Sequence, residues 1–282
     1  MGTRPEAIKL APLAKSLAKR GIVPRVVLTG QHPHLQPADY GLTGYPMAEL
    51  GCAGVANPHA HVGLVARALA PVVADAALVV VQGDTSSALG GALGGGLAGV
   101  PVAHVEAGLR SHDRENPWPE EDFRIAIDAM ADLLFAPTEL NAANLRRERV
   151  AGRVAVTGNT GIDALLAKLP IPTEAPTGTR RILVTCHRRE SWGEGLRSIA
   201  AALRRLADRG DVEIAMLLHP NPRVADEMRQ LLGGHRHIRL DQPCDHSEML
   251  RRMQASHLIL SDSGGVQEEA PTLGVPLLVL RE

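Results

Sequence analysis

Short runs rich in β-branched residues alternate along this chain with stretches of helical periodicity, and this alternation limits the possible folds more than any other feature. The predicted strands are residues 24–29, 77–82, 102–105, 133–135, 153–156, 181–185, 213–218, 237–240 and 257–260. Helical patterns such as 6–20 and 199–209 lie between most of them. Strands that alternate with helices form parallel sheets covered by helices, so we predict an α/β protein.

A proline-rich segment, 169–179, divides the chain into two halves and is predicted to be a linker. The halves, about 1–165 and 170–282, each have the length of one domain. The first residues have no strand before them, and 275–282 reads as a strand without a following helix. We therefore expect a chain that is truncated at both ends.

The composition argues against several classes of protein. A net charge of −1 and only 2% aromatic residues argue against nucleic-acid binding. No apolar run is long enough to span a membrane, and no signal peptide is recognisable. Three widely spaced cysteines, Cys52, Cys186 and Cys244, form no disulfide framework or zinc motif. We predict a cytoplasmic protein without a metal site.

The segment SDSGGVQEE at 261–269 follows a predicted strand and opens a helix. Free backbone N–H groups at Ser263, Gly264 and Gly265 would suit a diphosphate, because a helix N-terminus favours anions. Glu269 lies one helical turn beyond Gly265, where a carboxylate can accept hydrogen bonds from ribose. Alternatively, Ser263 is simply the N-cap of the helix.

Acidic residues follow two neighbouring predicted strands. Asp84 comes after 77–82 and Glu106 after 102–105. Ligands bind beyond the carboxyl ends of strands in open parallel sheets, so both acids are candidates for proton transfer. Alternatively, Asp84 is a helix N-cap. In the segment PWPEEDFR, Glu120 and Arg124 are four residues apart, and a surface ion pair is the simpler interpretation.

Several basic residues are further candidates. His187 and His219 follow predicted strands and could contact a phosphate or move a proton, although either could be an ordinary loop residue. Arg4 and Lys9 flank the start of the first helix, where they could clamp a phosphate or simply be solvated. The glycine-rich run 90–96 is interpreted as a helix packed closely against the sheet.

Taken together, these motifs resemble the non-hydrolysing UDP-N-acetylglucosamine 2-epimerases, in the same order over essentially the whole chain. The resemblance is carried by residues 2–13, 82–88, 101–111, 117–124, 136–145, 156–165, 184–191, 218–222 and 261–281. It implies two Rossmann-like domains facing a cleft, the glycosyltransferase-B type of fold. It also implies interconversion of UDP-GlcNAc and UDP-ManNAc, and a homodimer.

The resemblance also implies roles for individual residues. Asp84, Glu106, Glu120 and His187 correspond to catalytic residues. Those corresponding to substrate contacts are Arg4, Lys9, Arg124, Met249, Ser263, Gly264, Gly265 and Glu269. Met249 replaces an aromatic residue that stacks on uracil, and Cys244 stands near a glutamine position, so both bear on recognition of the base.

The reaction must invert a carbon whose proton is barely acidic, because C2 of the sugar is not next to a carbonyl group. The sequence has no dinucleotide fingerprint, so we expect elimination of UDP, a glycal intermediate and re-addition, without a cofactor. Three alternatives remain: a relative from a specialised amino-sugar pathway, a glycosyltransferase of the same fold, and a non-catalytic nucleotide-sugar binder.

Overall fold

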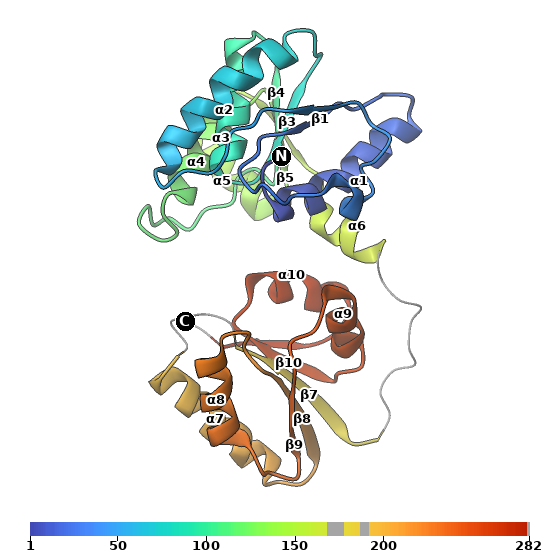
Figure 1. Ribbon diagram of the computed structural model, residues 1–282, viewed down its shortest axis with the longest axis vertical. Helices are drawn as coiled ribbons and strands as arrows, with labels where there is room; N and C mark the ends of the chain where they lie inside the picture. The colour runs from blue at the N-terminus through green and yellow to red at the C-terminus, as the bar shows by residue number, and fades with distance from the viewer. Residues whose placement is uncertain (168–177, 187–191, 281–282) are drawn as a thin grey trace. The chain divides into compact units, whose positions relative to one another are not determined.

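The computed structural model describes residues 1–167, 178–186 and 192–280, which form two compact units, Met1–Ala164 and Leu165–Glu282 (Figure 1). The predicted linker 169–179 lies largely outside the described residues, and so does His187. The first unit contains α1 (Arg4–Lys19), β1 (Val26–Leu28), the 3-10 helix η1 (Pro37–Tyr40), β2 (Met47–Glu49), α2 (Pro58–Val73), β3 (Val79–Gln82), α3 (Ser86–Leu97), β4 (Val102–Val105), α4 (Glu120–Met130), β5 (Leu133–Ala136), α5 (Glu139–Glu148) and β6 (Arg153–Val156). Helix α6 (Thr160–Leu166) crosses the boundary between the units.

The second unit contains β7 (Arg180–Thr185), α7 (Glu194–Ala207), β8 (Val212–Leu217), α8 (Pro222–Leu232), β9 (Ile238–Asp241), α9 (His246–Gln254), β10 (Leu258–Ser261), α10 (Gly264–Thr272) and β11 (Leu277–Val279). Its five strands form one parallel sheet in the order β11-β10-β7-β8-β9. In the first unit, β1 pairs with β2, and β3-β4-β5-β6 form a four-stranded sheet, again all parallel. The prediction of an α/β fold with parallel sheets is therefore confirmed.

The sheet of the second unit is covered on both faces (Figure 1). Successive side chains of a strand point to opposite faces. In β7, Ile182 and Val184 pack into a cluster with the apolar sides of α7 and α8. Leu183, between them, packs with residues of α9 and α10 instead. Burial on both faces explains why the central strands β7 and β10 carry continuous apolar runs, whereas the outer strand β9 alternates apolar and charged residues.

In the first unit, α2 and α3 pack unusually closely on the four-stranded sheet. A Cβ atom added at Gly90 would lie 2.6 Å from Cβ of Val65 on α2. On the sheet side, one added at Gly91 would lie 2.8 Å from Cγ1 of Val81. The interpretation of 90–96 as a helix packed against the sheet is confirmed, and Gly90 and Gly91 are needed because no side chain fits between these elements.

Most predicted strands differ from the observed ones by one or two residues at an end. Strand β2 was not predicted, because its three residues are largely exposed and show no apolar alternation. The helix predicted at 199–209 spans Glu194–Ala207, and its buried face runs from Leu196 to Ala207. Met1 donates its terminal N–H to the carbonyl of Val27 at 2.8 Å and accepts from N–H of Thr29 at 3.0 Å. The backbone of the first residue is thus bound along β1.

Candidate active site

The register of β3 and β4 brings two predicted acids to one edge of the sheet. Gln82 is paired with Val105, so the residues that follow them leave the sheet side by side. Asp84 and Glu106 both line a pocket of about 350 Å³. The other residues that line this pocket are Thr3, Pro5, Glu6, Lys9, His32, Gln82, Gly83, Thr85, Leu109 and Arg124.

Glu106 is held by a cation from the first helix and an amide from the neighbouring strand. Nζ of Lys9 lies 2.6 Å from Oε1 of Glu106, and both side chains are largely buried. The side-chain amide of Gln82 donates to the other carboxylate oxygen. Both carboxylate oxygens of Glu106 therefore accept a hydrogen bond. Lys9 lines the pocket, as predicted, and its partner there is Glu106.

The backbone at Glu106 adopts a conformation that few non-glycine residues take, with φ at +73°. Two hydrogen bonds to the carbonyl of Phe135, from N–H of Glu106 at 3.1 Å and of Ala107 at 3.0 Å, hold it there. Such a conformation costs roughly 1–3 kcal/mol, so it persists only where neighbouring structure imposes it. Here β5 imposes it on a residue that lines the pocket.

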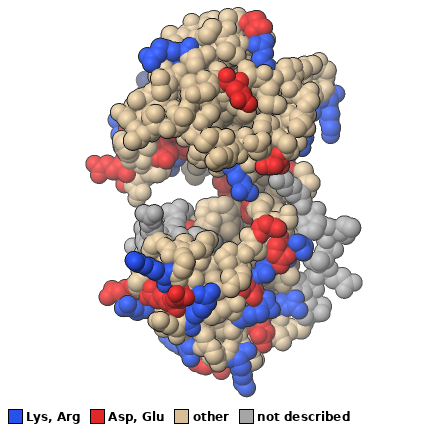
Figure 2. Space-filling model, viewed as in Figure 1, with Lys and Arg blue, Asp and Glu red and all other residues tan. Residues whose placement is uncertain are grey.

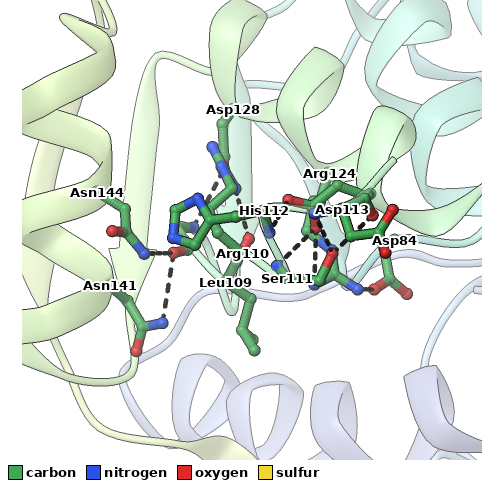
Figure 3. A network of polar contacts seen from close by, with 12 residues as sticks. Asp84, Leu109, Arg110, Ser111, His112, Asp113, Arg124, Asp128, Asn141 and Asn144 are labelled. Atoms are coloured by element: carbon green, nitrogen blue, oxygen red, sulfur yellow. Dashed lines mark hydrogen bonds and ion pairs between the residues drawn. The ribbon is translucent and has the colours of Figure 1, made fainter. Parts of the chain in front are cut away.

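Asp84 is bound to a cation on α4. Arg124 donates to Oδ2 of Asp84, and its NH1 lies 3.4 Å from Oε2 of Glu121 (Figure 3). The expected i,i+4 pair between Glu120 and Arg124 is thus replaced, because the guanidinium reaches across to the strand end. Asp84 is not the N-cap of α3 either, since Thr85 accepts the capping hydrogen bond from Ala88 at 3.0 Å.

Glu121 is buried under the loop that follows β4. Burial alone would raise its pKa, but hydrogen bonds from the N–H groups of Ser111 (3.0 Å) and His112 (3.1 Å), together with Arg124, hold the pKa below its ordinary value. The carboxylate fixes this loop and at the same time positions Arg124. The sequence analysis did not single out Glu121, which stands next to the more conspicuous Glu120.

Two predicted site residues of the first unit, Glu120 and Arg4, do not line the pocket as the described residues form it. Glu120 is the first residue of α4, and its Oε2 is buried without a hydrogen-bond partner among the described residues. Arg4 is the first residue of α1 and is exposed. His187 lies outside the described residues.

Glu6, His32, Gln82 and Thr85 line the pocket but were not predicted. Only Glu6 carried a clear signal, because Thr3-Arg4-Pro5-Glu6 has the spacing of a capping box. Its carboxylate accepts from N–H of Gly2 and from the hydroxyls of Thr3 and Thr85, at 2.8–2.9 Å. Glu6 therefore joins the start of α1 to the start of α3.

In the second unit, the predicted diphosphate-binding turn lies between β10 and α10. Ser263 occupies the N-cap position, but its side chain makes no capping hydrogen bond, and its N–H donates to Oγ of Ser261 at 3.0 Å. Gly264 and Gly265 begin the helix, are exposed, and have open space where a side chain would stand. The N–H of Ser263, which was predicted to be free, is thus bound within the turn, whereas those of Gly264 and Gly265 stand at the exposed helix start, where an anion is favoured.

Glu269 lies one turn into α10 and pairs with a histidine on α9. Nε2 of His246 is 2.8 Å from Oε1 of Glu269. Met249, which lies on α9 like His246, is half-buried and packs against an apolar cluster of the second unit. Cys244 precedes this helix, and burial raises the pKa of its thiol.

Comparison with known proteins agrees with this geometry. The sequence profile of the family described as UDP-N-acetylglucosamine 2-epimerase matches residues 15–282. A probable UDP-N-acetylglucosamine 2-epimerase of Ralstonia nicotianae is 42% identical, over 100% of this chain and 80% of the relative. The UDP-N-acetylglucosamine 2-epimerase of Escherichia coli K12 is 37% identical with the same coverage.

Solved structures show the same fold. A putative UDP-N-acetylglucosamine 2-epimerase from Listeria monocytogenes has a TM-score of 0.86 and 35% identity, covering 100% of this chain and 78% of its own. The Neisseria meningitidis enzyme, solved with UDP-GlcNAc bound, has a TM-score of 0.77 and 34% identity, covering 100% and 81%. The fold is thus the glycosyltransferase-B-like α/β fold of enzymes that act on nucleotide sugars. Within that class, the chain belongs to the UDP-N-acetylglucosamine 2-epimerase family.

No helix in the described ranges combines the length and apolar character that crossing a lipid bilayer requires.

Proposed function

We propose that this chain is an isomerase that inverts C2 of UDP-GlcNAc to give UDP-ManNAc. The observation that carries the proposal is the pairing of two pocket carboxylates with two cations, Glu106 with Lys9 and Asp84 with Arg124. Family membership supplies the substrate class, since relatives that share the whole chain bear this activity in their names.

The chemistry proceeds by elimination and re-addition. A carboxylate removes the C2 proton, the C–H electron pair forms a C1–C2 double bond, and the C1–O bond breaks as UDP leaves with its electrons. UDP oxygen then adds back to C1 while a proton is delivered to the opposite face of C2. Substrate and product are isomers, so the sequence needs no other reactant.

The first unit supplies the acids and bases for both faces of the sugar. Asp84 and Glu106 line the same pocket, and Glu120 lies one turn before Arg124 on α4. General acid–base groups of this kind typically contribute about 10²–10⁴-fold to a rate. Lys9 and Arg124 hold the carboxylates in place, and Lys9, with Arg4 and His187, can stabilise the leaving diphosphate.

The second unit is proposed to bind UDP. In the turn formed by Ser263, Gly264 and Gly265, the N–H groups of the two glycines are offered to the diphosphate, and Glu269 accepts from the ribose hydroxyls. Met249 and Cys244 lie on or next to α9, and they would bear on which base is accepted. In this proposal, residues 1–165 supply the catalytic acids, and residues 170–282 bind UDP.

A homodimer is also proposed. Figure 2 shows wide areas without charge on the first unit. Large apolar side chains are exposed on four of its helices, namely Leu64 on α2, Leu97 on α3, Met130 on α4 and Leu140 on α5. Light scattering after size exclusion tests this, and a monomer at micromolar concentration would contradict it.

Proton NMR of UDP-GlcNAc incubated with the protein in D₂O tests the reaction. We expect UDP-ManNAc to form and deuterium to enter C2. Asp84→Asn is expected to abolish both, whereas Asp211→Asn, an exposed aspartate of the second unit, is expected to leave them unchanged. A folded protein that binds UDP without any exchange at C2 would instead be a nucleotide-sugar binder.

A further inference from the structure

A buried histidine–aspartate pair lies directly behind the two pocket acids. His104 on β4 is 1% exposed, and Asp128 on α4 is fully buried. Nδ1 of His104 lies 2.6 Å from Oδ1 of Asp128, and its Nε2 lies 2.9 Å from the carbonyl oxygen of Gly83. Neither residue lines the pocket, so neither contacts the substrate in the proposed reaction.

The proton positions on His104 follow from its partners. A carbonyl oxygen can only accept, so Nε2 must carry a proton and donate it to Gly83. At 2.6 Å, a second proton must lie between Nδ1 and Asp128, because two bare acceptors would repel each other at that distance. Both ring nitrogens are therefore committed, and the ring cannot turn without breaking a buried hydrogen bond.

The bond to Gly83 fixes the turn that presents Asp84. Gly83 has φ at +73°, and its N–H donates to the carbonyl of Val105 at 3.2 Å. Its carbonyl is held by His104 from the same strand. Both polar backbone groups of the residue before Asp84 are thus bound to β4, the strand that ends at Glu106.

The other oxygen of Asp128 holds the loop that follows Glu106. Oδ2 accepts from N–H of Gly108 at 3.0 Å and lies 2.8 Å from NH2 of Arg110, whose side chain is buried (Figure 3). Arg110 in turn contacts Glu148 on α5 at 2.5 Å. One carboxylate therefore joins the turn before Asp84, through His104, to the loop after Glu106.

Asp128 also lies on the helix that supplies the other site groups. Glu120, Arg124 and Asp128 are spaced four residues apart on α4, which places them on one face. Arg124 binds Asp84 from this face. The position of α4 thus sets the placement of Glu120 directly and of Asp84 through Arg124.

We propose that His104 and Asp128 are positioning residues for the epimerisation, fixing Asp84 relative to Glu106 through the Gly83 carbonyl. The expected effect on kcat rests on the proposed function. The fixed position of the turn at Gly83 rests on the hydrogen bonds alone. A displacement of about 1 Å in a catalytic group can lower a rate about 100-fold, so the bond to Gly83 bears on kcat.

Two substitutions separate the two bonds of the ring. His104→Gln keeps a donor near the position of Nε2, facing Gly83, and loses the donor to Asp128. His104→Asn keeps a donor near the position of Nδ1, facing Asp128, and loses the one to Gly83. His235→Asn is the matched control, because His235 forms a surface pair with Asp208 at 3.0 Å in the second unit.

We expect His104→Asn to lower kcat about 10- to 100-fold with KM within about threefold. His104→Gln should retain kcat within about threefold, and His235→Asn should match the wild type. Melting temperatures and UDP titration correct each rate for folded protein. Equal kcat for the Asn and Gln variants, whether both normal or both reduced, would overturn the proposal, since a general packing role predicts no such order.

Hydrogen exchange measured by mass spectrometry supplies a readout that does not need activity. Peptides covering 83–88 should exchange faster in His104→Asn than in His104→Gln. If the wild type failed to epimerise UDP-GlcNAc, the proposed function would fail while this comparison still decided the positioning role. Identical exchange in the two variants would refute it.

Discussion

Nζ of Lys9 lies 2.6 Å from Oε1 of Glu106, although 97 positions separate the two residues in the chain. Lys9 comes from the second turn of α1 and Glu106 from the end of β4. The contact joins the first helix to the centre of the parallel sheet and places a cation beside a proposed proton-transfer group. Because both side chains are largely buried, the loss of either leaves its partner's charge poorly compensated.

Glu106→Gln is expected to lower kcat about 10²–10⁴-fold, because the amide cannot take up the C2 proton. Lys9→Met should lower it too, but by much less when Glu106 is already replaced, since the two side chains act as a pair. NMR rates of UDP-ManNAc formation measure all three variants. Glu139→Gln, an exposed glutamate of α5, is the control, and additive effects of the two substitutions would contradict the pairing.

Gly108→Ala is expected to destabilise the first unit by about 2–4 kcal/mol. Gly108 has φ at +82°, and a Cβ atom there would lie 2.3 Å from the carbonyl oxygen of Asn141. Gly99→Ala is the matched control, because Gly99 also has positive φ but open space around it, so it should cost only about 1 kcal/mol. Urea unfolding followed by circular dichroism distinguishes the two, and equal losses would mean that the steric clash is relieved.

Glu121 predicts a pH-dependent contribution to stability. Its folded pKa lies below the ordinary value of 4.5, so its stabilisation is fully present above that value and is lost as the pH falls through the folded pKa. Glu121→Gln should therefore destabilise the protein by about 1–3 kcal/mol near neutral pH, and the difference from wild type should shrink in acid. Urea unfolding between about pH 8 and pH 3 measures this. A difference that stayed constant below pH 4.5 would count against the assignment.

Gly265→Ala tests the nucleotide-binding turn without disturbing the fold. The nearest atom to an added Cβ is Oγ of Ser263 at 4.0 Å, so stability should be unchanged or slightly increased. If the diphosphate approaches the backbone there, the extra methyl group should weaken UDP binding about tenfold or more, or about 1.4 kcal/mol. Calorimetric titration with UDP gives the affinity, with Gly63→Ala, a helix glycine with open space around it, as the control. An unchanged affinity would place the diphosphate elsewhere.

The strands, most helices and the edge of the sheet that carries the acids were predictable because they depend on local pattern. Apolar runs of four to six residues between helical stretches define parallel strands whose carboxyl ends share one edge. Asp84, Glu106 and the Ser263 turn stand within three residues of the ends of such runs, so their placement followed from the sequence. The capping-box spacing at Thr3–Glu6 carried a signal for Glu6 in the same local way.

The partners of these residues were decided only by tertiary structure. Arg124 was expected beside Glu120, its neighbour on one helix face, yet it contacts Asp84 on another element. Lys9 beside Glu106, and His104 between Asp128 and Gly83, likewise depend on how β4 packs against α1 and α4. The sequence determined which groups reach the sheet edge, because backbone preference and apolar burial act over a few residues. Which charge meets which depends on strand register and helix packing, since these bring together side chains that no local pattern connects.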